Sequence, residues 1–393
     1  MTEESQIVAA ARRIRTELRT PLDGERVGGS LARLMDRWRD RGFVARRDTI
    51  ARLANESCFS RALLDESLDA LFAPFNLDSL RKFAGRAVSR AEVGGFVTAG
   101  NIAGAGLHEL LMTLLAGRGA IVKTATGEPH FFAAFSATLA EFDPQLGKRI
   151  AVFKWSRENP ALTCALAAAS DFIVAYGDDK TIVALDGSCA KRFSFGSRMS
   201  IAVLADPALN AAIASTVARD VTLFEQLGCL SPHQIFVEGT ELRTREFAVS
   251  LARSLEELSA VLSPASPGLE DAAAVRRARE TARWRAIAGE ALELFEGPRL
   301  AWTVIYDPAA RLTVAPGFRT VRVSTYAGFS DLSDRLALGR GRIEACAVAG
   351  STELKGSLAS LEIPYICEPG AMQSPPLEWR HGGGQFLDYL SAR

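Results

Sequence analysis

The chain has 393 residues, of which 48% are hydrophobic, and its 46 basic residues balance its 46 acidic residues. This length and composition allow two or three folded domains with a large core. The balanced charge, without a basic stripe in either half, excludes a dedicated nucleic-acid or anionic-membrane binder. No apolar run approaches the roughly 20 residues of a membrane helix, and the acidic start "MTEESQ" is unlike a secretion signal. We therefore expect a cytoplasmic protein with no membrane span.

Residues 1–92 alternate apolar and charged positions at helical spacing, as in "IVAAARRIRTEL" and "LARLMDRWRDRG". This pattern predicts amphipathic helices. Their arginine-rich faces also carry Glu and Asp, which is typical of a solvated helix surface. We assign no chemistry to this region.

From residue 93 the pattern changes to short apolar runs that alternate with longer helical ones. The successive segments are "VGGFVTAG", "GAGLHELLMTLLAG", "GAIVKT", "EPHFFAAFSATLAEF", "RIAVFKW", "ALTCALAAA" and "DFIVAYG". This alternation predicts a βαβαβαβ arrangement, which is a parallel sheet covered by helices. Such sheets bind ligands at the carboxyl ends of their strands.

Polar or glycine residues stand at three of these strand ends. Asn101 follows the first strand and Lys123 ends the second, in a chain with only 7 lysines; Gly177 and Asp178 end a third. Each of these residues is a candidate ligand contact, but each also has a plain structural explanation. Asn101 is explained as a helix cap, Lys123 as a lysine extending from a sheet edge, and Gly177 as a turn glycine. Neither GxGxxG nor GxxxxGK[ST] is present, so the best-known nucleotide motifs are missing.

The six cysteines are scattered, without CxxC spacing, so we expect neither a disulfide framework nor a metal site; they are Cys58, Cys164, Cys189, Cys229, Cys346 and Cys367. A structural cysteine usually lies on a periodic apolar face, where it acts as a small hydrophobe. Cys229 instead follows Gly228 and precedes Pro232, in "FEQLGCLSPHQIFVEG". Glycine frees the backbone and proline prevents a continuing helix, so this thiol is predicted on a turn.

Asn101, Lys123, Gly177, Gly196 and Cys229, in this order, resemble the aldehyde dehydrogenase superfamily, and within it the long-chain acyl-CoA reductases of bacterial luminescence systems. The resemblance covers roughly residues 93–384. Its motifs are "GNIAGAGLHELLMTLLAGRGAIVKTATGEP", "AYGDDKTI", "FSFGSRMS", "QLGCLSPHQIFVE", "APGFRTVRV" and "CEPGAMQSPPLEWRHGG".

The resemblance implies an α/β, aldehyde dehydrogenase-like fold with a doubly wound Rossmann-type cofactor domain and a smaller α/β catalytic domain. We place the boundaries as follows: a helical N-terminal region at 1–92, the NAD(P)-binding domain at 93–221, the catalytic domain at 222–363, and a tail at 364–393 that returns to the cofactor domain.

The resemblance also implies roles for individual residues. Cys229 is the expected nucleophile, and the Asn101 amide and the Cys229 backbone N–H are the expected oxyanion donors. The implied substrate is an acyl-CoA or acyl-carrier-protein thioester, reduced to an aldehyde by NADPH, with NADH as a possible cofactor. A homo-oligomer, or a complex with acyl-transferring enzymes, is also possible. Cofactor-binding residues are expected to be Lys123, Ala125, Glu128, Gly177, Asp178, Phe195 and Gly196.

The chain departs from this family pattern at several positions. The glutamate that activates water in hydrolytic relatives falls at about Ser194, so its absence favours reduction over hydrolysis. The reductases carry an amide at the position of His233 and a bulkier basic residue near the position of Ala371. These differences leave open which acyl group and which carrier the chain accepts. His233 is either a proton relay or a plain strand-end histidine.

Other interpretations also remain open at this point. Trp379, Arg380 and His381 either cover the active site or dock the C-terminal segment. Two alternative functions are an acyl-phosphate reductase of the glutamyl-phosphate type, which would release phosphate instead of a carrier thiol, and a non-catalytic subunit that holds an acyl-transferring partner.

Overall fold

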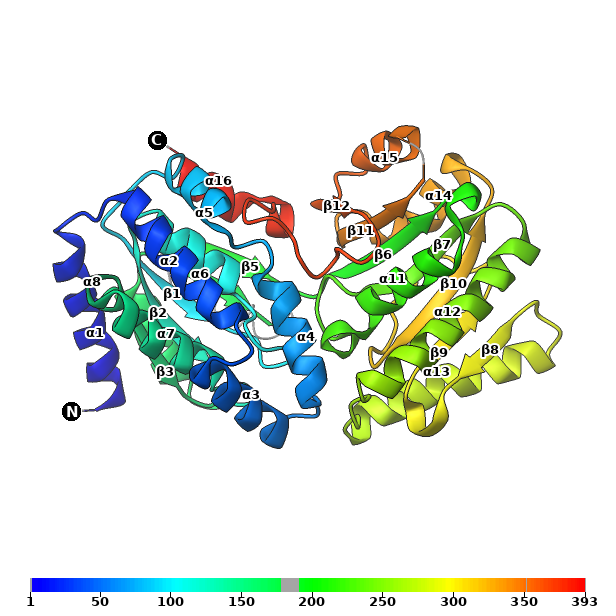
Figure 1. Cartoon of the computed structure of the whole chain (residues 1–393), viewed down its shortest axis with the longest axis horizontal. Coiled ribbons are helices and arrows are strands. Elements are labelled where there is room, and N and C mark those ends of the chain that lie inside the picture. The colour runs from blue at the N-terminus through cyan, green and yellow to red at the C-terminus, as the bar shows by residue number, and fades with distance from the viewer. Residues whose placement is uncertain (1, 178–190, 351, 393) are drawn as a thin grey trace. The chain divides into compact units, whose positions relative to one another are not determined.

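The structure is a computed structural model that describes residues 2–177, 191–350 and 352–392. The chain divides into two units (Figure 1). The first consists of Met1–Ser57, Leu68–Ser197 and Pro376–Arg393, and the second of Cys58–Ser67 and Arg198–Pro375.

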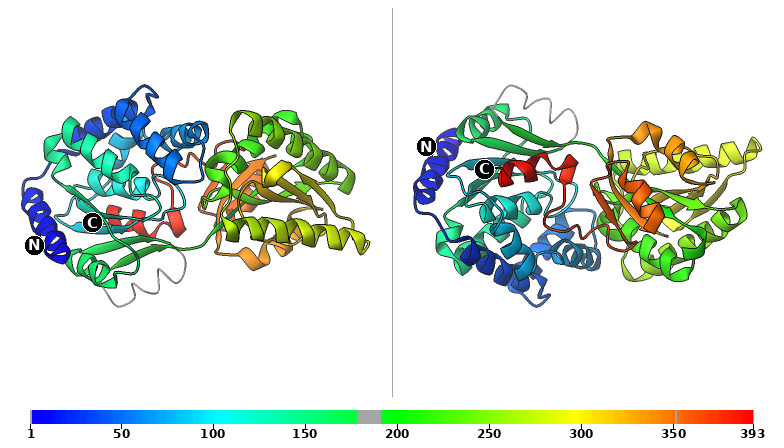
Figure 2. Two further views of the ribbon diagram at one scale, coloured as in Figure 1. Left: turned by 90° about the horizontal axis from the view of Figure 1, so that it is seen from below. Right: turned by 90° about the horizontal axis from the view of Figure 1, so that it is seen from above.

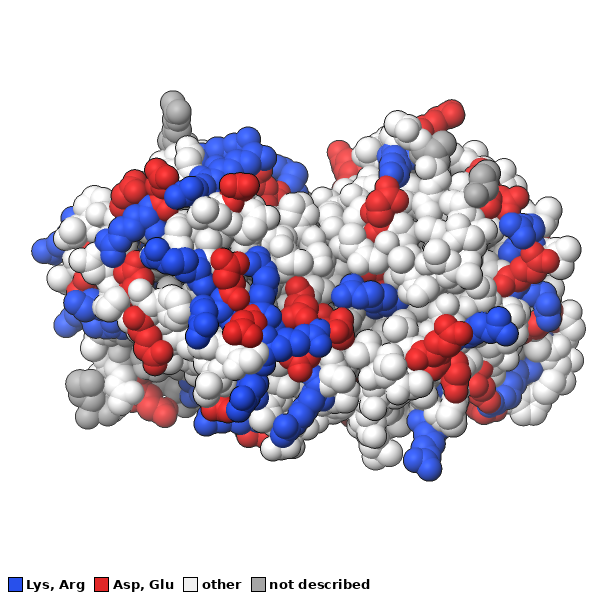
Figure 3. Space-filling model, viewed as in Figure 1, with Lys and Arg blue, Asp and Glu red and all other residues white. Residues whose placement is uncertain are grey.

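Helices form the N-terminal region, as predicted; they are α1 (Glu3–Leu18), α2 (Gly24–Arg39), α3 (Val44–Glu56), α4 (Arg61–Phe72) and α5 (Leu77–Ala84). Several begin at a side chain that caps the first turn. Asp23, for example, accepts a hydrogen bond from the Arg26 N–H at 3.0 Å at the start of α2. Basic and acidic side chains are intermixed over these helices on the face shown in Figure 3, which agrees with a solvated surface.

The described residues of the first unit form a five-stranded parallel sheet in the order β3-β2-β1-β4-β5. Its strands are β1 (Val93–Val97), β2 (Gly119–Thr124), β3 (Ile150–Lys154), β4 (Phe172–Tyr176) and β5 (Arg192–Phe195). The helices between them are α6 (Leu107–Leu115), α7 (Phe131–Phe142), α8 (Pro144–Gly147) and α9 (Pro160–Ala169). The chain runs outward from β1 through β2 to β3 and then returns to β4 on the other side of β1. The carboxyl ends of β1 and β4 therefore flank a topological switch point, where ligands bind in such sheets.

Helices cover both faces of this sheet (Figure 2). Apolar residues of α1 and α9 pack with strand residues in one buried cluster, while α6 packs on β2 and α7 on β3. The C-terminal helix α16 (Gln385–Ser391) also lies against α6. Burial of these apolar faces drives the packing. The predicted α/β class with a doubly wound parallel sheet is confirmed.

The second unit contains a seven-stranded sheet in the order β12-β11-β6-β7-β10-β9-β8, parallel except for β8. Its strands are β6 (Met199–Leu204), β7 (Pro232–Glu238), β8 (Glu293–Glu296), β9 (Thr303–Tyr306), β10 (Thr320–Tyr326), β11 (Ile343–Ala349) and β12 (Tyr365–Cys367). Its helices are α11 (Ala211–Thr222), α12 (Glu241–Val261), α13 (Leu269–Ile287), α14 (Phe329–Leu336) and α15 (Thr352–Ala359). Residues of α14 and α15 share a buried cluster with β6, β7, β10 and β11.

The two units do not divide at the domain boundary that we expected at residue 221. Residues 198–221 lie in the second unit, because β6 is hydrogen-bonded between β11 and β7. The tail divides as well: β12 and the following loop belong to the second unit, and residues 376–393 belong to the first. No helix among the described residues has the length and apolar character to cross a membrane.

Candidate functional site

The loops that follow β1 and β2 meet at the carboxyl edge of the first sheet. The Thr98 N–H donates to the Lys123 carbonyl at 3.1 Å, which extends the strand pairing into the loops. A Cβ on Gly100 would lie 2.9 Å from the Ala125 Cβ, so glycine is needed for this approach. Asn101, the next residue, is exposed beside this junction.

Lys123 carries its ammonium at this strand end although only 7% of the residue is exposed. Burial lowers its pKa below the ordinary value, and among the described residues the Nζ has no hydrogen-bond or ion-pair partner. Burial of a cation in the protein interior is unfavourable when no anion lies nearby. Its position fits a ligand hydroxyl or phosphate.

Glu128 has two distinct oxygen environments. Its Oε1 accepts hydrogen bonds from the N–H groups of His130 and Phe131, at 3.1 and 2.8 Å, and so caps the start of α7. Its Oε2 is buried without a partner in the described part of the chain. Burial raises the pKa of this carboxyl group. Lys123 and this unsatisfied oxygen are therefore two buried polar groups at one sheet edge that are available to a ligand.

The ends of β4 and β5 lie side by side, where the Gly177 N–H donates to the Phe195 carbonyl at 3.4 Å. The Phe195 ring stacks on Tyr176 and on His381, with ring centroids 5.0 and 3.9 Å away. Gly196 follows Phe195 at the partly exposed end of β5. Asp178, also an expected cofactor contact, lies outside the described residues.

The C-terminal tail contributes Trp379 and His381 to this group of stacked aromatic rings. Trp379 stacks on His381 at 4.1 Å, and His381 Nδ1 lies 2.8 Å from Glu109 Oε1 on α6. Burial would raise the pKa of Glu109, but the charge and hydrogen bond of His381 lower it below its ordinary value. Trp379 and His381 thus pack against residues of the first unit, at the end of β5 and on α6. Sequence reasoning missed Glu109, although an acidic residue inside the apolar "GLHELLMTLL" is a signal for a buried charge.

Cys229 lies on a turn between the short segment η2 (Leu223–Gln226) and β7, as predicted. Ser200 Oγ donates to the Cys229 carbonyl at 2.6 Å, and the Ser231 N–H donates to the Gly228 carbonyl at 3.1 Å. The residue is partly exposed. Within the described residues, its thiol and its backbone N–H have no hydrogen-bond partner. The turn therefore presents a nucleophilic atom and a donor together.

The backbone just before this turn is unusual. Phe224, Glu225 and Gln226 have φ values of 53°, 52° and 60°. Left-handed backbone costs non-glycine residues about 1 kcal/mol or more each, and such strain often accompanies functional sites. Sequence reasoning missed Glu225 and Gln226, because none of the residue types in "FEQ" predicts a left-handed backbone.

Three of the remaining described cysteines, Cys58, Cys346 and Cys367, are poorer candidates, and Cys164 is exposed on α9. Cys346 is fully buried in β11, and burial raises its pKa well above the ordinary value. Burial also raises the pKa of Cys367, to about 12, and that of Cys58. Thiols with raised pKa values form little of the reactive thiolate. No cluster of three or more His, Cys, Asp or Glu residues in the described ranges is arranged to hold a metal ion.

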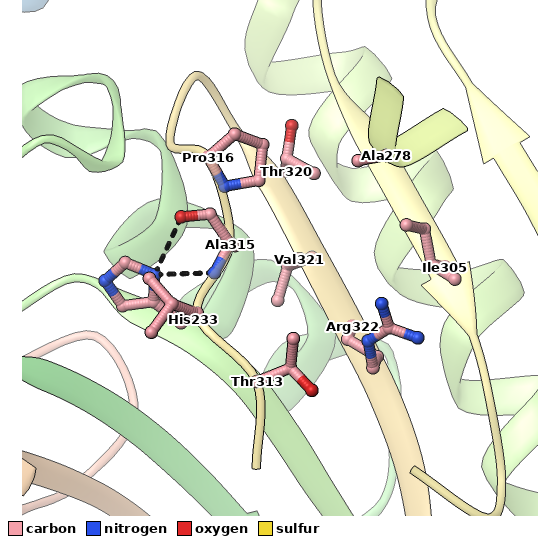
Figure 4. A pocket seen from close by; sticks show the side chains of 10 residues that line it. His233, Ala278, Ile305, Thr313, Ala315, Pro316, Thr320, Val321 and Arg322 are labelled. Carbon is pink, nitrogen blue, oxygen red and sulfur yellow. Dashed lines mark hydrogen bonds between the residues drawn. The ribbon is translucent and has the colours of Figure 1, made fainter. Parts of the chain in front are cut away.

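His233, at the start of β7, faces a cavity of about 40 Å³ (Figure 4). Its Nδ1 lies 3.0 Å from the backbone N and 3.2 Å from the carbonyl O of Ala315. Burial lowers its pKa, which favours a neutral ring whose Nδ1 accepts from the Ala315 N–H. A cavity of this size holds about one water molecule. These contacts favour the strand-end interpretation of His233.

Comparison with known proteins supports the resemblance. Residues 25–393 match the family described as Acyl-CoA reductase (LuxC). A long-chain acyl-protein thioester reductase of Aliivibrio fischeri is 23% identical over 302 residues, which are 74% of this chain and 61% of the relative. The corresponding enzyme of Vibrio harveyi is 25% identical over 53% of this chain and 43% of its own. The chain thus spans less than two thirds of the length of these relatives.

Solved structures with this fold include an oxidoreductase from Marinobacter aquaeolei, with a TM-score of 0.74, 16% identity, and coverage of 94% of this chain and 83% of its own. Another is an NAD-dependent benzaldehyde dehydrogenase from Corynebacterium glutamicum, with a TM-score of 0.72, 12% identity, and coverage of 99% and 89%. At these identities the likeness shows the fold, which is that of the aldehyde dehydrogenases. By the match over nearly its whole length, the chain belongs to the acyl-CoA reductase (LuxC) family.

Proposed function

We propose that this chain reduces an acyl thioester to an aldehyde with a reduced nicotinamide cofactor, through a thioacyl intermediate on Cys229. The observation that carries the proposal is the Cys229 turn, where one residue has a partly exposed thiol and a backbone N–H that meets no acceptor among the described residues. A nucleophile and an oxyanion donor are the two groups that acyl transfer requires. Membership of the acyl-CoA reductase family supports this chemistry.

In the first step the Cys229 thiolate attacks the thioester carbonyl carbon. A C–S bond to Cys229 forms, the carbonyl electrons move onto oxygen, and the carrier C–S bond breaks as the oxyanion collapses. The carrier leaves as its thiolate and takes up a proton from water. The Cys229 N–H and the Asn101 amide are the proposed donors to the oxyanion, and losing one such donor commonly costs about 10²- to 10³-fold in rate.

A reduced nicotinamide cofactor, held by the residues named below, would supply a hydride to the carbonyl carbon of the thioacyl group, and Cys229 would then carry a thiohemiacetal. Its collapse releases the aldehyde and regenerates the thiolate. Ser194 lies exposed on β5 and carries no carboxylate, so it provides no base to activate water against the thioester. Without that base, hydrolysis of the thioacyl intermediate is slow, and its reduction by hydride competes successfully.

NADPH is the proposed cofactor, with NADH as the alternative. Lys123 is a buried cation without a partner in the described residues, and it would contact the adenosine ribose and its 2′-phosphate. Glu128 would accept from a ribose hydroxyl through Oε2. An ionised Glu128 opposes a 2′-phosphate, whereas the raised pKa of this carboxyl group reduces that repulsion. Ala125, Gly177, Phe195 and Gly196 complete the proposed contacts.

We propose an acyl-CoA or an acyl-carrier protein as the thioester donor. The family is named for acyl-CoA, and the curated relatives are named for long-chain acyl-protein thioesters. A cytoplasmic location and a homo-oligomer, or a complex with an acyl-transferring enzyme, belong to the same proposal.

The test is intact-protein mass spectrometry after incubation with a panel of acyl thioesters and no cofactor. The wild type should gain the mass of the acyl group, release free carrier thiol, and yield aldehyde once NADPH is added. Cys229→Ala should bind NADPH and fail to gain the acyl mass. Cys58→Ala, which removes another exposed thiol, is the matched control and should acylate as the wild type does.

The same experiment separates the alternatives. Release of inorganic phosphate from an acyl phosphate, with no adduct from any thioester, would favour the acyl-phosphate reductase. If Cys229→Ala still acylates and reduces at nearly the wild-type rate, Cys229 is not the nucleophile and the proposed mechanism is wrong.

A further inference from the structure

The segment that carries Cys229 is closed by one buried side chain. The Gln226 amide Nε2 donates to the carbonyl of Pro232 at 2.7 Å, and so joins the residue three before Cys229 to the residue three after it. The same Nε2 donates to the Thr320 carbonyl at 2.8 Å, and Gln226 Oε1 accepts from the Thr320 N–H at 2.7 Å. Gln226 is 2% exposed, and both of its polar atoms are satisfied. The loop is thereby fixed to the first residue of β10.

The left-handed backbone that leads into the turn is held by a buried ion pair. Arg319 donates to Glu225 through Nη2 at 2.5 Å and through Nε at 3.1 Å, and neither residue is more than 1% exposed. The Glu225 carbonyl also accepts from the Phe318 N–H at 2.8 Å. A bidentate guanidinium–carboxylate pair fixes direction as well as distance. The backbone of Glu225 is therefore held by its side chain and by its carbonyl.

The far side of the turn is held independently. Ser200 Oγ donates to the Cys229 carbonyl and accepts from the Ala345 N–H at 3.0 Å, so the nucleophile's own peptide is tied to the central strands β6 and β11. Gln373 Nε2 donates to Ser231 Oγ at 3.0 Å. Hydrogen bonds that are buried or partly buried thus hold the turn on both sides of Cys229.

We propose that Gln226 is a positioning residue for Cys229: by closing the segment from Gln226 to Pro232, it aims the Cys229 backbone N–H at the thioester oxygen while the thiol attacks the carbon. This inference rests on the proposed function. Gln226 touches neither the substrate nor the thiol and acts through the backbone of the turn. Its loss should slow acylation, which needs thiol and donor together, more than reactions that need the thiol alone.

The test compares two reactions of the same thiol in Gln226→Met, which keeps the length of the side chain and removes its hydrogen bonds. Acylation of Cys229 at saturating thioester should fall about 100-fold, as for a lost oxyanion donor. The half-saturating thioester concentration should change little. Alkylation of Cys229 by iodoacetamide, which develops no oxyanion, should stay within about threefold of wild type because the thiol itself is unchanged. NADPH binding should also be unchanged.

Gln234→Met is the matched control. Gln234 is a fully buried glutamine on β7, two residues beyond Pro232, but its amide bonds to Ser324 Oγ and the Thr313 N–H and not to the turn. Its substitution should lower stability without separating acylation from alkylation. If Gln226→Met does not fold, the isosteric Gln226→Glu serves in its place, because an ionised carboxylate can still accept from the Thr320 N–H but cannot donate to the Pro232 carbonyl, and a loss of acylation of about tenfold is then expected.

The outcomes are distinguishable. If wild type acylates and Gln226→Met acylates equally fast, the positioning role is wrong and the proposed function stands. Equal losses in acylation and alkylation show a general disruption and also overturn the inference. If wild type forms no adduct with any thioester, the proposed function fails, and the inference fails with it.

Discussion

His381 and Glu109 form a buried pair between the C-terminal tail and α6, with His381 Nδ1 2.8 Å from Glu109 Oε1. The two residues are 272 positions apart in the chain. The His381 ring is also stacked between Phe195 and Trp379. The tail is therefore fastened at the end of β5, beside the residues proposed to contact the cofactor.

Replacing His381 should loosen this tail and destabilise the first unit. In His381→Ala the Glu109 carboxylate stays buried but loses its 2.8 Å contact with the imidazole, which should lower the free energy of unfolding by about 3 kcal/mol. Thermal denaturation measures the change. Arg380→Ala is the control, because Arg380 pairs with Asp388 on an exposed surface and such pairs contribute about 0 to 1 kcal/mol. Equal effects of the two substitutions on the free energy of unfolding would contradict a stabilising buried contact at His381.

Asp220 should give the second unit a pH-dependent stability. Its carboxylate accepts from the N–H groups of Gly370 and Met372, at 2.6 and 3.1 Å, and burial raises its pKa from 3.8 to about 7. The folded chain then keeps this proton up to about pH 7, whereas the unfolded chain loses it near pH 4. The free energy of unfolding should therefore fall as the pH rises from about 4 to about 7, by as much as about 4 kcal/mol.

The measurement compares urea unfolding at pH 5 and pH 8 for wild type and Asp220→Asn. The variant lacks the titrating group, so the part of the pH dependence that Asp220 contributes should disappear, and wild type should lose more stability than the variant between the two pH values. Asp334→Asn, at an exposed aspartate, should behave as wild type does. An unchanged difference in Asp220→Asn would assign the effect to another group.

Lys123→Ala should weaken the binding of NADPH more than that of NADH. A charge-assisted contact to a 2′-phosphate is worth about 1.5 to 3 kcal/mol, so the KM for NADPH should rise roughly 10- to 100-fold. Lys154→Ala is the control, since Lys154 ends the neighbouring strand β3 but is exposed. Unchanged KM values for both cofactors in Lys123→Ala would show that the assignment is wrong.

Ser194→Glu should divert the thioacyl intermediate to free acid. A carboxylate at this exposed position of β5 would supply the base that activates water, so hydrolysis should compete with reduction. The ratio of acid to aldehyde, measured by chromatography with NADPH present, should rise at least tenfold. Ser194→Gln adds similar bulk without the base and should keep the wild-type ratio. An equal rise in both variants would implicate packing instead of base catalysis.

Local pattern was sufficient for the first sheet and for the Cys229 turn. The apolar runs around Val97, Thr124 and Tyr176 are short, rich in β-forming residues and separated by helical periods, so their pairing as parallel strands follows from the chain order. Gly228 and Pro232 limit the backbone around Cys229 by their own covalent structure. The family resemblance likewise depended on residues that the sequence alone displays.

Only the tertiary structure decided which sheet each later strand joins. The run at Met199–Leu204 has the same composition whichever sheet it enters, and its pairing with β11 and β7 involves residues up to about 145 positions away. The same holds for the buried charges. Glu225 with Arg319, and Glu109 with His381, are separated by 94 and 272 positions. Periodicity reports which face of an element is buried but not which distant charge meets it there, so these partners became visible only when the chain was folded.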